Sequence, residues 1–396
     1  MGKVQFCGVL LYALGLGACG AGTKGNLASL AASREQSGPV EIATADGVLR
    51  LTVLSADTVR VLLMRSAQSR VPASFAVSAT VSQSSALYTL EEHPGLVILR
   101  TSQLGVRITK QPLRIALLDA QGQLLSEQAA PVAWQNPGLV STWKLAPREQ
   151  VYGLGDKVKG FDRRGQAFEF WNTDAYGFQS DADPLYKSIP FALFLRDGRA
   201  HGLFLDTPAR AQVDVGKSNH DVFSYAAESG DSLDFYLFAG PDPKRVISAY
   251  TALTGRMPLP PRWALGYHQS RYSYLTEQEA RSVAERLRAD AIPSDALWLD
   301  IDYQLGNAPF TVDSNAFPHF AGMVSDLTKL GMRTVVITDP HLKSYQGQAA
   351  PSGYAPYDSG AAGDHFLRAA DGGFVEDKVW PGLSVFPEFT LTRTRR

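Results

Sequence analysis

Trp298-Leu299-Asp300-Ile301-Asp302-Tyr303 is the stretch that decides the fold of this chain. It places two carboxylates and a phenol directly after the apolar run 296–299, a pattern typical of a buried strand. Polar groups at the end of such a strand are costly to bury unless they have a partner or a function. We therefore expect Asp300 and Asp302 at the mouth of a barrel, where they line a binding pocket.

The segments around this stretch alternate between strand and helix patterns. Strands are expected at 263–268, 296–301 and 333–338. A capping box, formed by Thr276 and Glu279, begins the helix between the first two strands, and a second helix separates the last two. A βα unit that repeats about every 35 residues predicts a parallel sheet of the (β/α)8 TIM-barrel type.

Polar side chains follow each of the three expected strands. The carboxyl ends of parallel strands meet at one face of a barrel, where catalytic groups gather. The residues concerned are His268, Arg271, Asp300, Asp302, Asp339 and His341. We interpret Asp339 and His341 as pocket wall, and His268 as either a positioned hydrogen-bonding residue or a proton shuttle. Because no second histidine lies at ligand spacing from His341, no metal is expected.

The two carboxylates of the decisive stretch admit two interpretations. On an extended strand Asp300 and Asp302 would share a face about 6.6 Å apart, a spacing that suits the acid and nucleophile of a glycosidase. Alternatively, they hydrogen-bond to loop amides or pair with an arginine such as Arg271. The spacing alone does not decide between these interpretations.

The sequence from 40 to 255 has the pattern of an all-β domain. Short apolar or alternating runs between turn residues, over about 200 residues, predict a β-sandwich. The clearest hairpin turns at Asp197-Gly198. Asp242-Pro243 opens a helix at the end of this domain, and the proline-rich linker 257–261 follows. The barrel domain is accordingly expected to span 256–396.

One stretch of the β domain, 170–186, lacks the turn-bounded strands of its surroundings. It begins with Phe170-Trp171-Asn172-Thr173-Asp174 and is polar and aromatic to Tyr186, which favours either a functional loop or an ordinary hairpin with a surface turn. Aromatic rings beside Asn and Asp suit sugars, whose CH faces stack while their hydroxyls need acceptors. Trp171 and Asp174 are therefore candidate sugar contacts.

The first residues have the pattern of an export signal. Lys3 precedes an apolar run, and small residues lead into Cys19. Residues 1–19 resemble a bacterial lipoprotein signal peptide in which Cys19 becomes lipidated, and 20–39 is interpreted as a flexible tether. We expect a protein exported to the cell envelope, anchored by lipid in the outer membrane or periplasm, with this anchor as its only membrane contact.

Composition excludes several classes of protein. A chain of 396 residues with 45% apolar content is long enough for two or three domains with their own cores. The formal net charge is −1 and the sequence has no runs of like charge, so it lacks the basic patch that indicates nucleic-acid binding. The two cysteines, Cys7 and Cys19, both lie in the expected leader, which leaves the remaining sequence without a disulfide or thiolate metal site. No cofactor is expected.

Several separated motifs resemble glycoside hydrolase family 31, the α-glucosidase and α-xylosidase group. They run from about residue 151 to 389 in the order of the family. The motifs are Tyr152-Gly153-Leu154-Gly155, Trp171-Asn172-Thr173-Asp174, the stretch 262–272, Trp298-Leu299-Asp300-Ile301-Asp302-Tyr303 and Val379-Trp380-Pro381-Gly382. The resemblance implies an N-terminal β-sandwich, of the galactose-mutarotase type, before a (β/α)8 barrel that hydrolyses α-linked glucosides or xylosides with retention.

The resemblance also assigns roles to residues at matching positions. Asp302 would accept hydrogen bonds from the hydroxyls of the non-reducing sugar, Asp174 would reach in from the sandwich, and Asp300 would be a neighbouring support. Tyr272 stands where the family often has tryptophan, and Leu342 occupies the aliphatic position after the third strand. The complete set of expected oligosaccharide contacts is Asp302, Asp174, Asp300, Tyr272, Arg271, His268, Leu342 and Trp380.

The sequence departs from the family at its end. The nucleophile and acid motifs that the resemblance implies do not occur, and the family pattern ends near Thr390, before Leu391-Thr392-Arg393-Thr394-Arg395-Arg396. About 130 residues follow Trp263, against about 250 for a whole barrel. We therefore expect a C-terminally truncated, interrupted reading frame with no catalytic residue, inactive alone. The alternative is a lipid-anchored protein that binds carbohydrate without cleaving it.

Overall fold

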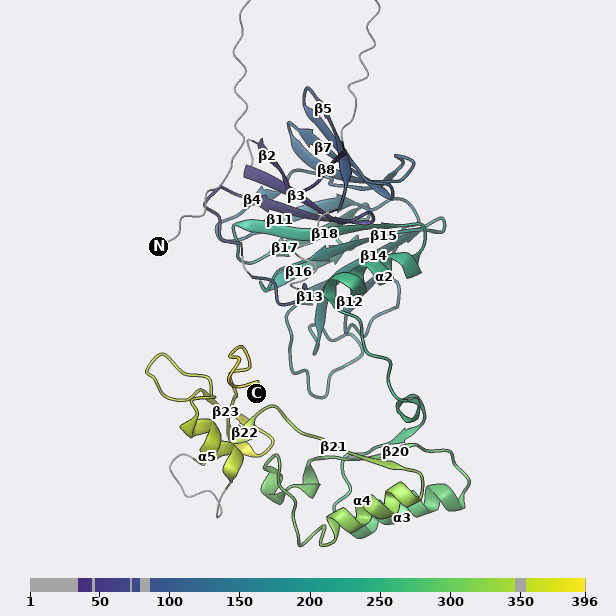
Figure 1. The fold of residues 1–396 in the computed structure, drawn as a ribbon, viewed down its shortest axis with the longest axis vertical. Helices are drawn as coiled ribbons and strands as arrows, with labels where there is room; N and C mark the ends of the chain where they lie inside the picture. The colour runs from purple at the N-terminus through teal and green to yellow at the C-terminus, as the bar shows by residue number, and fades with distance from the viewer. Residues whose placement is uncertain (1–34, 45–46, 72, 79–85, 346–353, 396) are drawn as a thin grey trace, which may run out of the picture. The chain divides into compact units, whose positions relative to one another are not determined.

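The computed structural model describes residues 35–44, 47–71, 73–78, 86–345 and 354–395 (Figure 1). The chain forms two compact units, which divide between Arg256 and Met257, one residue beyond the expected boundary. The expected signal peptide 1–19, with Cys19, lies outside the described residues. Within the described ranges, no helix has both the length and the apolar character needed to span a membrane.

The first unit consists of three antiparallel sheets. A six-stranded sheet has the order β1 (Glu35–Gln36), β5 (Tyr88–His93), β6 (Leu96–Arg100), β7 (Leu104–Lys110), β8 (Leu113–Asp119) and β9 (Leu124–Glu127). A five-stranded sheet has the order β10 (Ala133–Trp134), β11 (Leu139–Lys144), β17 (Val222–Ala227), β16 (Ala211–Val215) and β13 (Gln166–Phe170). A seven-stranded sheet has the order β12 (Gln150–Gly155), β14 (Ser188–Arg196), β15 (Arg199–Leu205), β18 (Ser232–Gly240), β4 (Thr58–Met64), β3 (Gly47–Ser55) and β2 (Val40–Thr44).

Strand β18 shows how the layers of this unit are held together. Its residues alternate between two apolar clusters, because successive side chains of a strand point to opposite faces. Phe235 and Leu237 enter the main core, which gathers residues of all three sheets, while Tyr236 and Phe238 lie on the other face. Helix α2 (Pro243–Thr254) covers that second face, and its N-terminus is capped by Asp242 as the sequence predicts. The predicted β-sandwich is confirmed.

Two local features of the first unit test predictions made from the sequence, of which one is confirmed and one is wrong in part. The Asp197-Gly198 hairpin is present, with φ angles of 50° and 78°, as a tight turn between β14 and β15 requires. The expected tether 20–39 is wrong in its last part, because Glu35–Gln36 forms β1 and pairs with Tyr88–Thr89. Such a short edge strand carries no hydrophobic alternation, so the sequence pattern did not mark it.

The second unit begins with a parallel three-stranded sheet. Its strands are β19 (His268–Gln269), β20 (Ala296–Leu299) and β21 (Arg333–Val336), in that order. Helices α3 (Glu277–Ala289) and α4 (Phe320–Lys329) lie side by side along one face of the sheet (Figure 1), and they enclose a core with Leu297 and Leu299. The predicted βα alternation and parallel pairing are confirmed, and Thr276 caps α3 by accepting a hydrogen bond from the Glu279 N–H.

The first predicted strand of this unit is largely wrong. Residues Arg262–Leu265 form a 3-10 turn, in which the Ala264 N–H bonds to the Pro261 carbonyl and the Gly266 N–H to the Trp263 carbonyl. The turn closes directly after a proline pair, so the apolar residues that suggested a strand belong to it. Of residues 262–269, only His268–Gln269 pairs with β20.

The remainder of the second unit is an antiparallel layer with one helix. Strands β22 (Leu342–Lys343), β24 (Gly382–Val385) and β23 (Glu376–Val379) form a sheet in that order, and helix α5 (Ala355–Ala362) packs against it. Two short 3-10 turns, Ile301–Tyr303 and Leu305–Asn307, follow β20. They set the geometry of the site.

Candidate functional site

The end of β20 changes the geometry expected for the two carboxylates. The strand stops at Leu299, and Ile301–Tyr303 turns as a 3-10 helix with Asp300 at its N-cap. Residues two apart lie on different sides of such a turn, so the assumption of an extended strand with both carboxylates on one face is wrong. The 6.6 Å separation, and with it the acid and nucleophile interpretation, has no basis in this structure.

Asp300 and Asp302 have different surroundings. The Asp300 Oδ1 atom accepts a hydrogen bond from the Ile301 N–H at 2.7 Å, which caps the turn. Asp302 lies in the first turn of the same short helix and is half-buried. Among the described residues no side chain or main-chain group donates to its carboxylate. Asp300 therefore shapes the turn, and Asp302 keeps its acceptors available for a ligand.

His268 is held between two tryptophans. The Trp298 Nε1–H group lies 3.1 Å from His268 Nδ1, and His268 Nε2 lies 3.2 Å from the Trp263 carbonyl oxygen. An indole N–H can only donate, so Nδ1 accepts and Nε2 carries the proton that is donated to the carbonyl. Trp263 also stacks on the imidazole with centroids 5.7 Å apart. Both ring nitrogens are engaged, which favours the positioning role of His268 over the proton shuttle.

Arg271 does not pair with the carboxylates of the decisive stretch. Its Nη1 atom lies 3.2 Å from Glu279 Oε1 on α3, and its guanidinium lies over the Tyr274 ring. The interpretation in which Arg271 neutralises Asp300 or Asp302 is therefore wrong. Tyr272, by contrast, is 74% exposed, so its ring is accessible for stacking.

The end of β21 opens into a hollow of about 460 Å³. Asp339 and Leu342 line it, so two of the residues expected after the third strand do share one pocket. Leu342 is buried in the apolar cluster beneath it. His341 is buried beside Asp339, with Nε2 3.8 Å from Oδ2. Burial lowers the pKa of His341 below its ordinary value, although the neighbouring Asp339 carboxylate opposes this shift.

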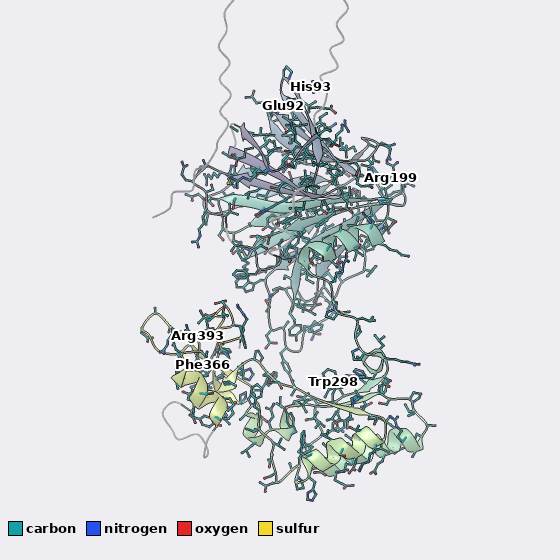
Figure 2. All side chains as sticks on the ribbon, in the orientation of Figure 1. Glu92, His93, Arg199, Trp298, Phe366 and Arg393 are labelled. Atoms are coloured by element: carbon teal, nitrogen blue, oxygen red, sulfur yellow. The ribbon has the colours of Figure 1, made fainter. Side chains whose placement is uncertain are left out.

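Several residues of this hollow were missed by sequence reasoning. They come from segments without a periodic pattern and converge only in the folded chain, as Phe366 and Arg393 do in Figure 2. The missed residues include Phe310, Ser359, His365, Phe366, Phe389 and Arg393. For Phe310 the only signal in the sequence is its position in the loop after the decisive stretch. Arg393 is held by the Asp364 carboxylate at 3.0 Å.

Trp380 and the loop of the first unit complete the expected contacts. Trp380 is 53% exposed in the turn between β23 and β24. The stretch 171–187 is irregular between β13 and β14, as predicted, and Asp174 is exposed within it. Asn172 anchors this loop, since its Oδ1 atom accepts a hydrogen bond from the Ser188 N–H at 2.8 Å. Asp174 belongs to the first unit and Asp302 to the second, and the role of each as a sugar contact stays a prediction.

The acidic and histidine side chains do not gather as metal ligands. Within the part of the chain that the structure describes, no group of three or more His, Cys, Asp or Glu residues could hold a metal ion. The chemistry available at the strand ends is instead that of hydrogen bonding and stacking: a carboxylate with unused acceptors, exposed aromatic rings and a half-buried aspartate in a hollow. These groups suit a neutral, hydroxyl-rich ligand.

Comparison with known proteins finds the same family at both ends of the chain. Residues 48–214 match the glycosyl hydrolase 31 N-terminal galactose mutarotase-like domain, and residues 257–396 match the glycosyl hydrolases family 31 TIM-barrel domain. Alpha-glucosidase 2 of Bacillus thermoamyloliquefaciens is 37% identical over 353 residues, which cover 88% of this chain and 44% of that protein. Alpha-glucosidase of Saccharolobus solfataricus is 31% identical over 271 residues, covering 68% and 38%.

A solved structure gives the same result. A mutant GH31 dextranase of Flavobacterium johnsoniae in complex with isomaltotriose has a TM-score of 0.80 and 29% sequence identity, over 91% of this chain and 44% of that one. The chain therefore spans less than half the length of the relatives that it matches here. Both units take part in the similarity.

Proposed function

The chain belongs to glycosyl hydrolase family 31, and we propose from this that it supplies the sugar-recognition groups of a site that hydrolyses α-linked glucosides. Its relatives include alpha-glucosidases and a dextranase complexed with isomaltotriose. The observation that carries the proposal is Asp302, a half-buried carboxylate at the end of a parallel strand with no donor among the described residues.

Asp302 suits a sugar for a physical reason. An ionised carboxylate offers about four acceptor sites, and the vicinal hydroxyls of a pyranose supply donors at matching spacing. Hydrogen bonds to a charged group contribute about 1.5–3 kcal/mol each, more than those between neutral partners. Because Asp300 caps the turn and His268 fixes the neighbouring Trp298 indole, Asp302 sits on a rigid support. A rigid support reduces the entropy lost on binding.

In this proposal the residues of the chain bind and orient the sugar, and bond cleavage needs further groups. Hydrolysis with retention takes a carboxylate nucleophile and a carboxylic acid on opposite sides of the glycosidic bond. The motifs that the family resemblance implies for these two groups do not occur in residues 1–396. We therefore expect the polypeptide of residues 1–396 to bind an α-glucoside weakly and not to hydrolyse it, since positioning without a nucleophile leaves the chemical step uncatalysed.

The test compares binding and turnover in the same preparation. Asp302→Asn should weaken isomaltotriose binding about tenfold or more, because it removes the charge from the acceptor. Glu285→Gln, which neutralises an exposed acid on α3, is the matched control and should leave binding unchanged. Titration calorimetry measures the affinity of both variants for isomaltotriose. Unchanged affinity in Asp302→Asn contradicts the recognition role, and brisk hydrolysis of an aryl α-glucoside that disappears in Asp302→Ala contradicts the assignment of the catalytic groups.

We also propose that the protein is exported and anchored through Cys19. The support is the small-residue pattern before this cysteine, which resembles a lipoprotein signal. Growth of expressing bacteria with an alkyne-labelled fatty acid should label the wild-type chain, and Cys19→Ser should abolish the label. Labelling that persists in Cys19→Ser, or its absence from the wild type, contradicts the anchor.

A further inference from the structure

The first unit has a hollow of its own at the base of the loop 171–187. Its volume is about 310 Å³, at the lower end of the range of about 300–1,000 Å³ typical of ligand pockets. It is lined by the end of β13, the first residues of the loop 171–187, β14 and the segment after β15. Those used below are Trp171, Asn172, Ser188, Pro190 and Pro208. None of them belongs to the second unit, so the hollow is complete within the first.

Trp171 is held in place and still accessible. The Arg210 guanidinium lies over the indole, 5.7 Å from the ring centroid, and is itself paired with Glu169. This contact fixes one face of the ring. The side chain nevertheless remains 49% exposed. An indole that is fixed on one side and open on the other is prepared to stack against a flat, weakly polar ligand without ordering a flexible side chain first.

Unused hydrogen-bonding groups border the same hollow. Asn172 uses its Oδ1 atom to hold the Ser188 N–H at 2.8 Å, which leaves the two donors of its amide group unassigned among the described residues. The Ser188 hydroxyl is buried and has no hydrogen-bond partner in the part of the chain that the structure describes. Pro190 and Pro208 supply apolar wall. One ring face, an amide donor and an apolar wall together match a pyranose, which presents CH groups on its face and hydroxyls at its rim.

We propose that this hollow is a separate carbohydrate subsite that takes one sugar ring of an α-linked glucan, stacked on the open face of Trp171. The size fits a single ring better than a long oligosaccharide. The residues that line the hollow carry no charge, and the guanidinium of Arg210 beside it is already paired with Glu169, so an anionic ligand gains little there. The choice of α-linked glucan rests on the function proposed above, whereas the stacking and the amide donor do not.

The test labels the full chain with 5-fluorotryptophan and titrates it with isomaltotriose, observed by fluorine NMR. The chain has six tryptophans, so six resonances are resolved in principle, and Trp171→Phe and Trp298→Phe assign the two that matter. The Trp171 resonance should shift with a saturation curve of its own. It should still shift in Asp302→Asn, which is expected to remove only the response of Trp298.

The possible results separate this subsite from the site at Asp302. A Trp171 resonance that moves while Trp298 does not would support the subsite and refute the function proposed above. A Trp171 resonance that stays fixed while Trp298 saturates would overturn the subsite alone. A shift of Trp171 that is lost in Asp302→Asn would also overturn it, because both signals would then report one pocket.

A second variant tests the chemistry without unfolding the loop. Asn172→Asp keeps the acceptor that holds the Ser188 N–H but removes the amide donors, so it should weaken binding at Trp171 severalfold. Asn219→Asp is the matched control, because Asn219 Oδ1 also accepts a main-chain N–H, that of Asp221, outside the hollow. An affinity at Trp171 that is equal in the two variants would contradict the amide contact and the proposed orientation of the ring.

Discussion

A buried histidine makes the stability of the first unit sensitive to acid. His201 lies in β15 with 4% of its surface exposed, and its ring stacks on Phe194 with centroids 4.6 Å apart. Its Nε2 atom has no hydrogen-bond partner among the described residues. Burial, with a smaller contribution from Arg196, lowers the pKa of His201 from 6.5 to about 3. The folded unit therefore holds this imidazole neutral at all but strongly acidic pH.

The sign and size of the effect follow from proton linkage. Between pH 6.5 and pH 3 the unfolded chain binds a proton at His201 and the folded chain does not, so stability falls as the pH falls. With these two pKa values, the free energy of unfolding should drop by about 3 kcal/mol between pH 7 and pH 4. Burial raises the pKa values of Glu149, Asp206 and Asp234, and these carboxyls act in the opposite direction. The contribution of His201 must therefore be separated from that of these carboxyls by mutation.

His201→Leu isolates the contribution of the imidazole. The variant removes the titrating group and its unpartnered nitrogen, so it should keep most of its pH 7 stability at pH 4, while the wild type does not. Hydrogen exchange of the β14, β15 and β18 amides reports opening of this unit specifically. An equal loss of protection between pH 7 and pH 4 in both proteins would refute the reasoning, since His201 would then contribute nothing to the acid sensitivity.

Three further substitutions test the packing of the chain. Lys157→Ala removes a fully buried ammonium that lies 2.6 Å from Asp183, and should lower the free energy of unfolding in denaturant by about 3–5 kcal/mol. The control is Lys187→Ala, which removes a side chain that is 70% exposed and should change this free energy by no more than about 0.5 kcal/mol. Gly202→Ala places a Cβ 2.8 Å from a valine methyl of α2, and should cost about 1–3 kcal/mol by the same measurement. Glu277→Gln weakens the bonds from Arg281 and the His319 N–H, and should lower hydrogen-exchange protection in α3 by about 1.5–3 kcal/mol.

Local signals in the sequence predicted much of the fold. The Asp242 cap of α2 and the Asp197-Gly198 turn are each specified by residues that act within a few positions of one another. The parallel pairing of β20 with β21 follows from the helical period of the segment between them. In each case the residues that make up the sequence pattern also make the interactions that form the element.

The features that the sequence did not predict depend on distant partners. Strand β1 exists because β5 offers an edge to it, not because its two residues favour extension. The hollow after β21 collects Phe310, Phe366 and Arg393 from segments far apart in the chain, and no period links them. The turn at Arg262–Leu265 was missed for another reason, since its apolar residues fit a strand pattern until the closing bonds are known.

The decisive stretch shows why spacing is a weak guide to the role of a carboxylate. Asp300 and Asp302 are equivalent in the pattern, but one hydrogen bond makes them different: because Asp300 caps the turn that follows β20, its acceptor is occupied and its position fixed. The same cap forces the chain out of the extended form, which rotates Asp302 away from the face of its neighbour and leaves its oxygens without a donor among the described residues. By capping the turn, Asp300 thereby leaves the Asp302 carboxylate available to bind a ligand. Replacing Asp300 should weaken sugar binding through Asp302 even if Asp300 never touches the ligand.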